Sequence, residues 1–295
     1  MKPRSTTTIG VALAIALAGC FGGEATAPPA TSTPEPVATP VVSRYRLEVT
    51  AWEQGFVLTF HQATATLDAK GGPVTITVTV ANPGTDDASL DAPIRLTASG
   101  AAFDLVHGTV LPVVVAGGSA DVTLEFDVEG RSNIDDGVIR VGRTADHIVQ
   151  VPFLPGPVDA LTLEPRSANA KATVTAGGIR IVLRNVGIRW DLPDWYDELP
   201  VSSEAVTLTY DVTYIGTFSG GFAFTAANIG LRLPNGTIVA PRRDGHSQST
   251  ALLGPGKTVP SLFSRFEIPS GLTGTFALVA RDGSTQQAVK FTIAP

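Results

Sequence analysis

The residues best suited to chemistry gather in one short stretch, residues 190–200, which reads Trp-Asp-Leu-Pro-Asp-Trp-Tyr-Asp-Glu-Leu-Pro. It mixes aromatic rings with carboxylates, and the candidate ligand-binding residues are Trp190, Asp191, Asp194, Trp195, Tyr196, Asp197 and Glu198. Aromatic faces beside carboxylates could hold a sugar, and several carboxylate oxygens could hold Ca²⁺. The carboxylates lack a calcium-loop spacing such as Asp-x-Asp-x-Asp-Gly. The open alternative is a loop whose rings cover the end of their own domain or the seam between two domains.

Other reactive side chains show no arrangement typical of catalysis. The four histidines, His61, His107, His147 and His246, are scattered, and no pair has zinc-ligand spacing. No Gly-x-Ser-x-Gly nucleophile elbow occurs. The best local set for a hydrolytic triad is Asp244, His246, Ser247 and Ser249. We therefore predict no catalytic residues, no metal, no cofactor and no enzymatic activity.

The only cysteine, Cys20, ends the sequence Leu-Ala-Gly-Cys at residues 17–20. A basic start, with Lys2 and Arg4, and an apolar run over residues 9–18 precede it. This pattern resembles the signal of bacterial lipoproteins, which is cut before the cysteine. The resemblance implies that residues 1–19 are removed and that the thiol of Cys20 carries a diacylglycerol. The protein would then be anchored to a membrane by lipid and face outward in the cell envelope.

Two alternatives to lipidation are an N-terminal transmembrane anchor and an ordinary secreted protein with a free thiol. The apolar run is about half of the roughly 20 residues that span a bilayer. Each buried CH₂ contributes about 0.8 kcal/mol, so several acyl chains would anchor the protein firmly. We expect the lipid on Cys20 to be the contact with the membrane.

The next segment, residues 20–44, is rich in proline and threonine. Proline denies helix and ladder hydrogen bonds, and few residues here could build a core. We expect an extended tether after the lipidated cysteine. Without Lys2 and Arg4 the chain has 27 acidic and 19 basic residues, a net charge of −8. Acidic protein repels phosphate backbones, so nucleic acid is not an expected partner.

From residue 45 onward, short alternating stretches separated by turns predict an all-β chain. In the segment 74–80, valine and isoleucine alternate with threonine, which places Val74, Ile76, Val78 and Val80 on one buried face. The strands predicted in the first half are 46–50, 56–66, 74–80, 94–98, 111–115, 122–128, 138–141 and 148–153. That spacing of short strands is typical of a β-sandwich.

The second half repeats the order of the first. Residues 55–60 correspond to 178–183, 74–78 to 206–210, and 126–128 to 266–268. We predict a tandem duplication, with domain 1 over 45–155 and domain 2 over 158–295, divided near the prolines of 152–157. The offset between the copies grows from 123 to 132 before residue 206, so the second copy gains nine residues in the 190–200 loop.

This order of strands and Gly-rich turns resembles the immunoglobulin-like modules of bacterial surface lipoproteins, the group that includes the immunoprotective extracellular antigens. The resemblance implies tandem immunoglobulin-like β-sandwiches in the cell envelope and brings no catalytic residues. We predict a non-catalytic, lipid-anchored surface protein that binds another envelope component. The alternative is glycan or Ca²⁺-dependent small-ligand binding through the 190–200 loop. The sequence does not indicate an oligomeric state.

Overall fold

The computed structural model describes residues 39–143, 147–168, 170–191, 199–200, 202–243 and 249–294. Almost all regular elements among them are β-strands that pair antiparallel, with one short 3₁₀-helix, η1 (Ala226–Asn228). The prediction of an all-β sandwich fold is confirmed.

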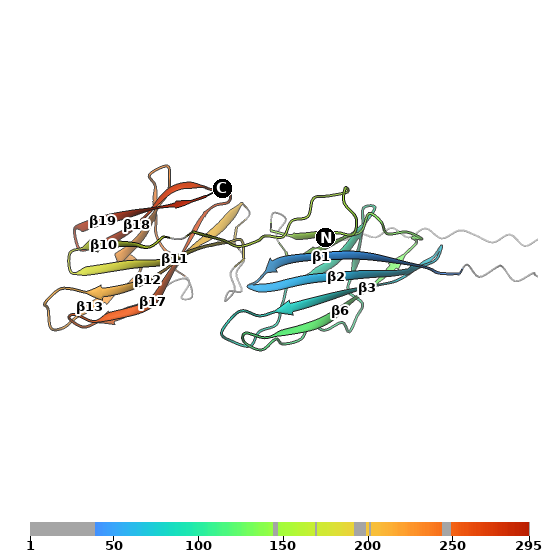
Figure 1. Ribbon diagram of the computed structural model, residues 1–295, viewed down its shortest axis with the longest axis horizontal. Helices are drawn as coiled ribbons and strands as arrows, with labels where there is room; N and C mark the ends of the chain where they lie inside the picture. Colours follow the sequence, from blue (N-terminus) through green and yellow to red (C-terminus); the bar gives the residue numbers. More distant parts are fainter. Residues whose placement is uncertain are drawn as a thin grey trace, which may run out of the picture. The chain divides into compact units, whose positions relative to one another are not determined.

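The first half of the described chain forms two four-stranded sheets (Figure 1). One has the order β1-β2-β3-β6 and the other the order β5-β4-β7-β8. The chain crosses between the sheets after β3, after β5 and after β6, the alternation found in immunoglobulin-like sandwiches. The bounds are β1 Val41–Glu53, β2 Phe56–Leu67, β3 Gly71–Ala81, β4 Ile94–Ala98, β5 Ala101–Asp104, β6 Ser119–Glu129, β7 Val138–Val141 and β8 Val149–Pro152.

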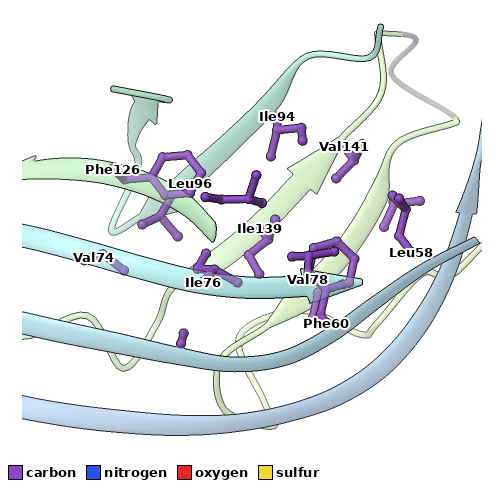
Figure 2. Close-up of a cluster of buried hydrophobic side chains, with 14 of the residues drawn as sticks. Leu58, Phe60, Val74, Ile76, Val78, Ile94, Leu96, Phe126, Ile139 and Val141 are labelled. Carbon is purple, nitrogen blue, oxygen red and sulfur yellow. The ribbon is translucent and has the colours of Figure 1, made fainter. Parts of the chain in front are cut away.

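Apolar side chains from both sheets meet in the first core. The face predicted for β3 is confirmed, because all four of its valine and isoleucine side chains are buried. Figure 2 shows Ile76 and Phe126 of one sheet pointing toward Leu96 and Ile139 of the other. Period-two alternation produces this arrangement, since successive side chains of a strand point to opposite faces.

The second half repeats this strand order. Its sheets run β10-β11-β12-β17 and β15-β14-β18-β19, while β9 pairs with β11, and β13 pairs with β16. The chain therefore visits the two sheets in the same sequence as before. The bounds are β9 Arg166–Ala168, β10 Ala172–Ala176, β11 Ile179–Arg189, β12 Ser203–Tyr214, β13 Phe222–Phe224, β14 Ile229–Arg232, β15 Ile238–Val239, β16 Ala251–Leu253, β17 Thr258–Pro269, β18 Gly274–Asp282 and β19 Thr285–Ile293.

Strand register relates the two copies residue by residue. Phe60 pairs with Val78, and Leu183 pairs with Tyr210 at the equivalent place. A β-bulge follows each of these pairs directly, after Phe60 in one copy and after Leu183 in the other. The pairing of Val74 with Phe126 recurs as Val206 with Phe266. The residues aligned from the sequence thus occupy matching positions in the sheets.

One strand predicted from the sequence is wrong. Residues 111–115 form no strand, and only Val114 pairs there, through an isolated bridge to Ala88. Val114 is buried, whereas Val113 and Val115 are 67% and 60% exposed. An apolar run predicts burial, but this one has no strand beside it to pair with along its length. Strand β5 was not predicted from the sequence.

The buried residues form two main hydrophobic clusters, one for each copy. Two residues beyond the predicted boundary nevertheless belong to the first core: Leu163 is buried in it, and Trp190 packs against it. Residues 38–295 form one compact unit. The predicted domain limits stay a prediction.

Candidate functional site

Two of the seven predicted ligand-binding residues are described, Trp190 and Asp191. Trp190 packs against the first core, with its ring edge-on to that of His147 at a centroid distance of 5.2 Å. The Asp191 carboxylate accepts hydrogen bonds from the Gly55 backbone N–H and, at 2.8 and 3.0 Å, from the Arg189 guanidinium. Both side chains therefore make contacts within the chain. The remaining predicted residues lie outside the described residues: Cys20, Asp194, Trp195, Tyr196, Asp197 and Glu198.

Asp191→Ala is expected to lower the free energy of unfolding by about 1.5–3 kcal/mol, the usual worth of hydrogen bonds to a charged group. The Gly55 N–H and Arg189 would each lose a partner that is almost completely buried. Chemical unfolding measures the change. An unchanged stability together with weakened Ca²⁺ or glycan binding would instead assign Asp191 to a ligand site.

Among the three described histidines, His61 forms a hydrogen bond to a hydroxyl that could serve as a nucleophile. Its Nε2 lies 2.8 Å from Thr79 Oγ1, and the Thr79 hydroxyl donates to Asp121 Oδ1 at 2.6 Å. Since the single hydroxyl proton points to Asp121, His61 Nε2–H must donate to Thr79. A general base would have to accept the hydroxyl proton of Thr79, whereas His61 donates a hydrogen bond to this hydroxyl. The direction of the hydrogen bond therefore does not suit activation of Thr79 as a nucleophile.

The second copy has an ion pair at the same bulge. Arg184 follows Leu183 as His61 follows Phe60, and it binds Asp211, the equivalent of Thr79. The Arg184 hydrogen bond is the largest cause of the lowered pKa of Asp211. The bulge therefore carries a cross-strand polar contact in both copies. Of the predicted triad set, only Ser249 is described. No group of three or more His, Cys, Asp or Glu side chains in the described ranges could hold a metal ion.

A groove of about 570 Å³ lies between the segment 106–112 and strand β6. Its lining residues are Val106, His107, Gly108, Thr109, Val110, Pro112, Asp121, Val122, Thr123 and Glu125. Four valines of this region are exposed to solvent: Val106, Val110, Val113 and Val115. Clustered exposed apolar residues beside a concave surface are typical of interaction sites.

Along the groove, β6 presents its outer edge, the side opposite β3. The Glu125 carbonyl accepts from Val106 N–H at 2.9 Å on that side. Because N–H and C=O of alternate strand residues point the same way, those of Thr123 and Asp121 also point outward. At the other end of β6, the Asn82 N–H donates to the Gly118 carbonyl. The Gly118 carbonyl therefore points toward β3, which agrees with the groups of Asp121 and Thr123 pointing outward. Within the described chain, no strand pairs with these four outward groups.

The groove is acidic. Asp121 and Glu125 line it, and no lysine or arginine is among the lining residues. Asp127 and Glu129 extend the row of exposed carboxylates along the same face of β6. A cationic group would therefore be favoured here over an anionic one.

The equivalent edge in the second copy, that of β17, is closed by the chain itself. Arg242 N–H binds the Arg265 carbonyl at 3.0 Å, as Val106 N–H binds Glu125. Ser249 then binds both groups of Phe263, the equivalent of Thr123: its N–H donates to the Phe263 carbonyl at 2.8 Å, and its Oγ accepts from the Phe263 N–H at 2.9 Å. Arg265 is only 6% exposed, whereas Glu125 is exposed. The two copies differ most clearly at this edge.

No protein-family model matches this sequence, and a search of curated proteins finds no match. Among solved structures, the conserved domain protein from Bacillus anthracis aligns with 85% of this chain and 90% of its own, at 11% identity and a TM-score of 0.24. A score this low supports no argument, so the fold assignment rests on the strand pairing.

None of the helices in the described residues has the length and apolarity needed to cross a membrane.

Sequence reasoning missed the groove, although its parts were visible. The apolar segment 111–115 predicts a strand, and the acidic residues of β6 alternate with apolar ones. What the sequence did not indicate is that the outer edge of β6 would be left open. That depends on where the preceding loop runs.

Proposed function

We propose that this protein is a non-catalytic, lipid-anchored surface protein that binds another component of the cell envelope through the β6 groove, the surface lined by residues 106–112 and 121–125. One observation carries the proposal: no strand of the described chain pairs with this edge in the first copy, where exposed valines flank it, whereas the chain itself binds the equivalent edge in the second. Satisfying the edge internally is possible for this fold, as β17 shows. This difference between the copies supports a binding role for the open edge of β6.

The groove offers what a binding site needs, namely apolar area, backbone hydrogen-bonding groups and charge. Exposed valines supply apolar area, which contributes about 25 cal/mol per Å² removed from water. The outward backbone groups of Asp121 and Thr123 supply hydrogen bonds that fix orientation. The carboxylates of Asp121 and Glu125 supply the charge that selects a partner.

The sequence Leu-Ala-Gly-Cys that ends at Cys20 and resembles a lipoprotein signal supports the proposed location. Lipid on Cys20 would hold the chain at a membrane, and the proline-rich residues 20–44 would act as a spacer, at about 3.1 Å per residue when extended. A spacer of this length keeps the sandwiches clear of the bilayer surface. Partners in the envelope would then be within reach.

A photo-cross-linking amino acid placed at Val110 tests the binding proposal in cells that express the protein. Leu252 is the matched control, because it is 78% exposed against 79% for Val110 and lies in the second copy. We expect a discrete adduct from position 110 and none of that mass from position 252. The same adduct from both positions, or none from 110, would refute the proposal. The anchor is tested in parallel: Cys20→Ser should move the protein out of the membrane fraction.

A further inference from the structure

The outer edge of β6 has outward-pointing backbone groups to which a further strand could pair. Between Glu125, whose carbonyl is bound by Val106, and the turn at Gly118, the N–H and C=O of Thr123 and Asp121 point into the groove. The open stretch lies between Gly118 and Glu125, where the strand rises roughly 3.3 Å per residue. A short extended segment of another chain fits that length and could make up to four backbone hydrogen bonds.

Building on the proposed function, we propose that the occupant is an extended, cationic polypeptide segment that pairs with β6 as an added strand. Ser249 in the second copy shows the hydrogen bonding that such a segment would provide, since it binds both backbone groups of Phe263. An incoming residue opposite Thr123 would make the corresponding two bonds, with its backbone carbonyl in the place of the Ser249 Oγ. The first copy thus obtains from a partner what the second copy obtains from its own chain.

Side-chain alternation defines the partner further. Asp121, Thr123 and Glu125 share the exposed face of β6, so basic residues at every second position of the added strand lie beside these carboxylates. The residues between them face the side of Val122, which packs against the core, and Val106 and Val110 also line the groove. The recognised segment therefore alternates basic and apolar residues over about four positions.

The charges also disfavour the pairing of β6 with the β6 edge of a second copy of this chain. Pairing β6 with β6 would place two acidic edges side by side, and like charges opposite one another in a ladder are destabilising. Acidic residues on an open edge discourage such self-association. The same residues attract a basic strand, and the exposed valines beside them add apolar contact that a purely protective edge does not need.

A synthetic peptide of alternating lysine and valine, eight residues long, is the probe. Its binding to the full chain is measured by fluorescence anisotropy at low and high salt. One control peptide has glutamate in place of lysine. Two further controls are lysine–valine peptides N-methylated at every second residue, one at the lysines and the other at the valines. N-methylation leaves the charge unchanged and removes the backbone donors of one edge. We expect the glutamate peptide not to bind, and one of the two methylated peptides to bind at least about tenfold more weakly.

Protein variants test the same edge from the other side. Thr123→Pro removes the outward N–H, yet leaves the ladder to β3 intact because that N–H does not point toward β3. Thr123→Val keeps the N–H and is the control. Thr123→Pro should weaken peptide binding at least about tenfold, while Thr123→Val should not. Asp121→Asn with Glu125→Gln should remove most of the salt dependence.

Equal binding of both methylated peptides, or of Thr123→Pro and Thr123→Val, would overturn strand addition. Should Thr123→Pro fail to fold, the methylated peptides decide alone. A position-110 adduct found together with methylation-insensitive binding would retain the proposed function and reject the added strand. Absence of both adduct and peptide binding would reject both.

Discussion

Val78→Asp is expected to unfold the sandwich built from β1 to β8. Val78 is 3% exposed and lies between Phe60 of β2 and Val122 of β6. A carboxylate there has no cation to pair with and costs several kcal/mol, a large part of the 5–15 kcal/mol by which domains are usually stable. Amide hydrogen exchange should show loss of protection across β2, β3 and β6.

The matched control is Thr77→Asp, one residue earlier on the solvent face of the same strand. Thr77 is exposed, and its change to aspartate should alter stability by no more than about 0.5–1 kcal/mol. Because the second core is a separate cluster, β11 and β12 should stay protected in Val78→Asp. Equal effects of the two substitutions would contradict the assignment of the buried face of β3.

Arg166→Met is expected to destabilise the second copy by about 3–5 kcal/mol at neutral pH, the cost of breaking a buried ion pair from one side. Arg166 on β9 binds both carboxylate oxygens of Glu204 on β12, at 2.8 and 2.9 Å. Glu204 is 0% exposed. Methionine preserves much of the apolar volume of arginine but leaves the carboxylate without its cation.

The pH dependence of this loss distinguishes charge from packing. Burial raises the pKa of the Glu204 carboxyl above its ordinary 4.5, more than pairing with Arg166 lowers it. A raised folded-state pKa gives stability that is present below the unfolded pKa and lost as pH rises through the folded pKa. Removing Arg166 raises that pKa further. The difference between variant and wild type should therefore shrink as the pH falls toward 4, as followed by urea unfolding.

Arg184→Met provides the comparison in the same sheet. The Arg184–Asp211 pair is much more exposed, so its loss should cost at most about 1 kcal/mol. A similar cost for Arg166→Met, or a cost that persists unchanged at pH 4, would show that burial of Glu204 does not depend on its partner.

Local sequence patterns correctly predicted the strands that have one face buried against neighbouring strands. In β3, Val74 to Val80 alternate, and this alternation alone is enough to define the inner face, because period two is a property of any extended chain. The repeat was readable for the same reason. Equivalent residues such as Val74 and Val206 must meet equivalent partners, here Phe126 and Phe266, so both copies keep similar spacing.

Local patterns misled where pairing depends on distant segments. The run at residues 111–115 is as apolar as a strand, yet only Val114 finds a partner, and its neighbours stay exposed. The aromatic and acidic residues at 190–191 left a ligand site and a packed loop open as alternatives; in the structure Trp190 packs against the core of the first copy, and Asp191 accepts from the Gly55 N–H. Composition does not distinguish a ring that waits for a ligand from one that packs against its own protein.

The sequence by itself determined the all-β class, the inner faces of the strands and the correspondence of the two copies, because these follow from alternation along the chain. Only the tertiary structure decided that the edge of β6 is open and that of β17 is closed. Both strands end in the same pattern, Phe-Asp-Val and Phe-Glu-Ile at residues 126–128 and 266–268. The difference lies in the hydrogen bonds between Ser249 and Phe263, which join residues 14 positions apart, whereas the bond from Arg242 to β17 has its counterpart in the first copy. Backbone groups are the same in every residue, so their pairing depends on the path of the chain.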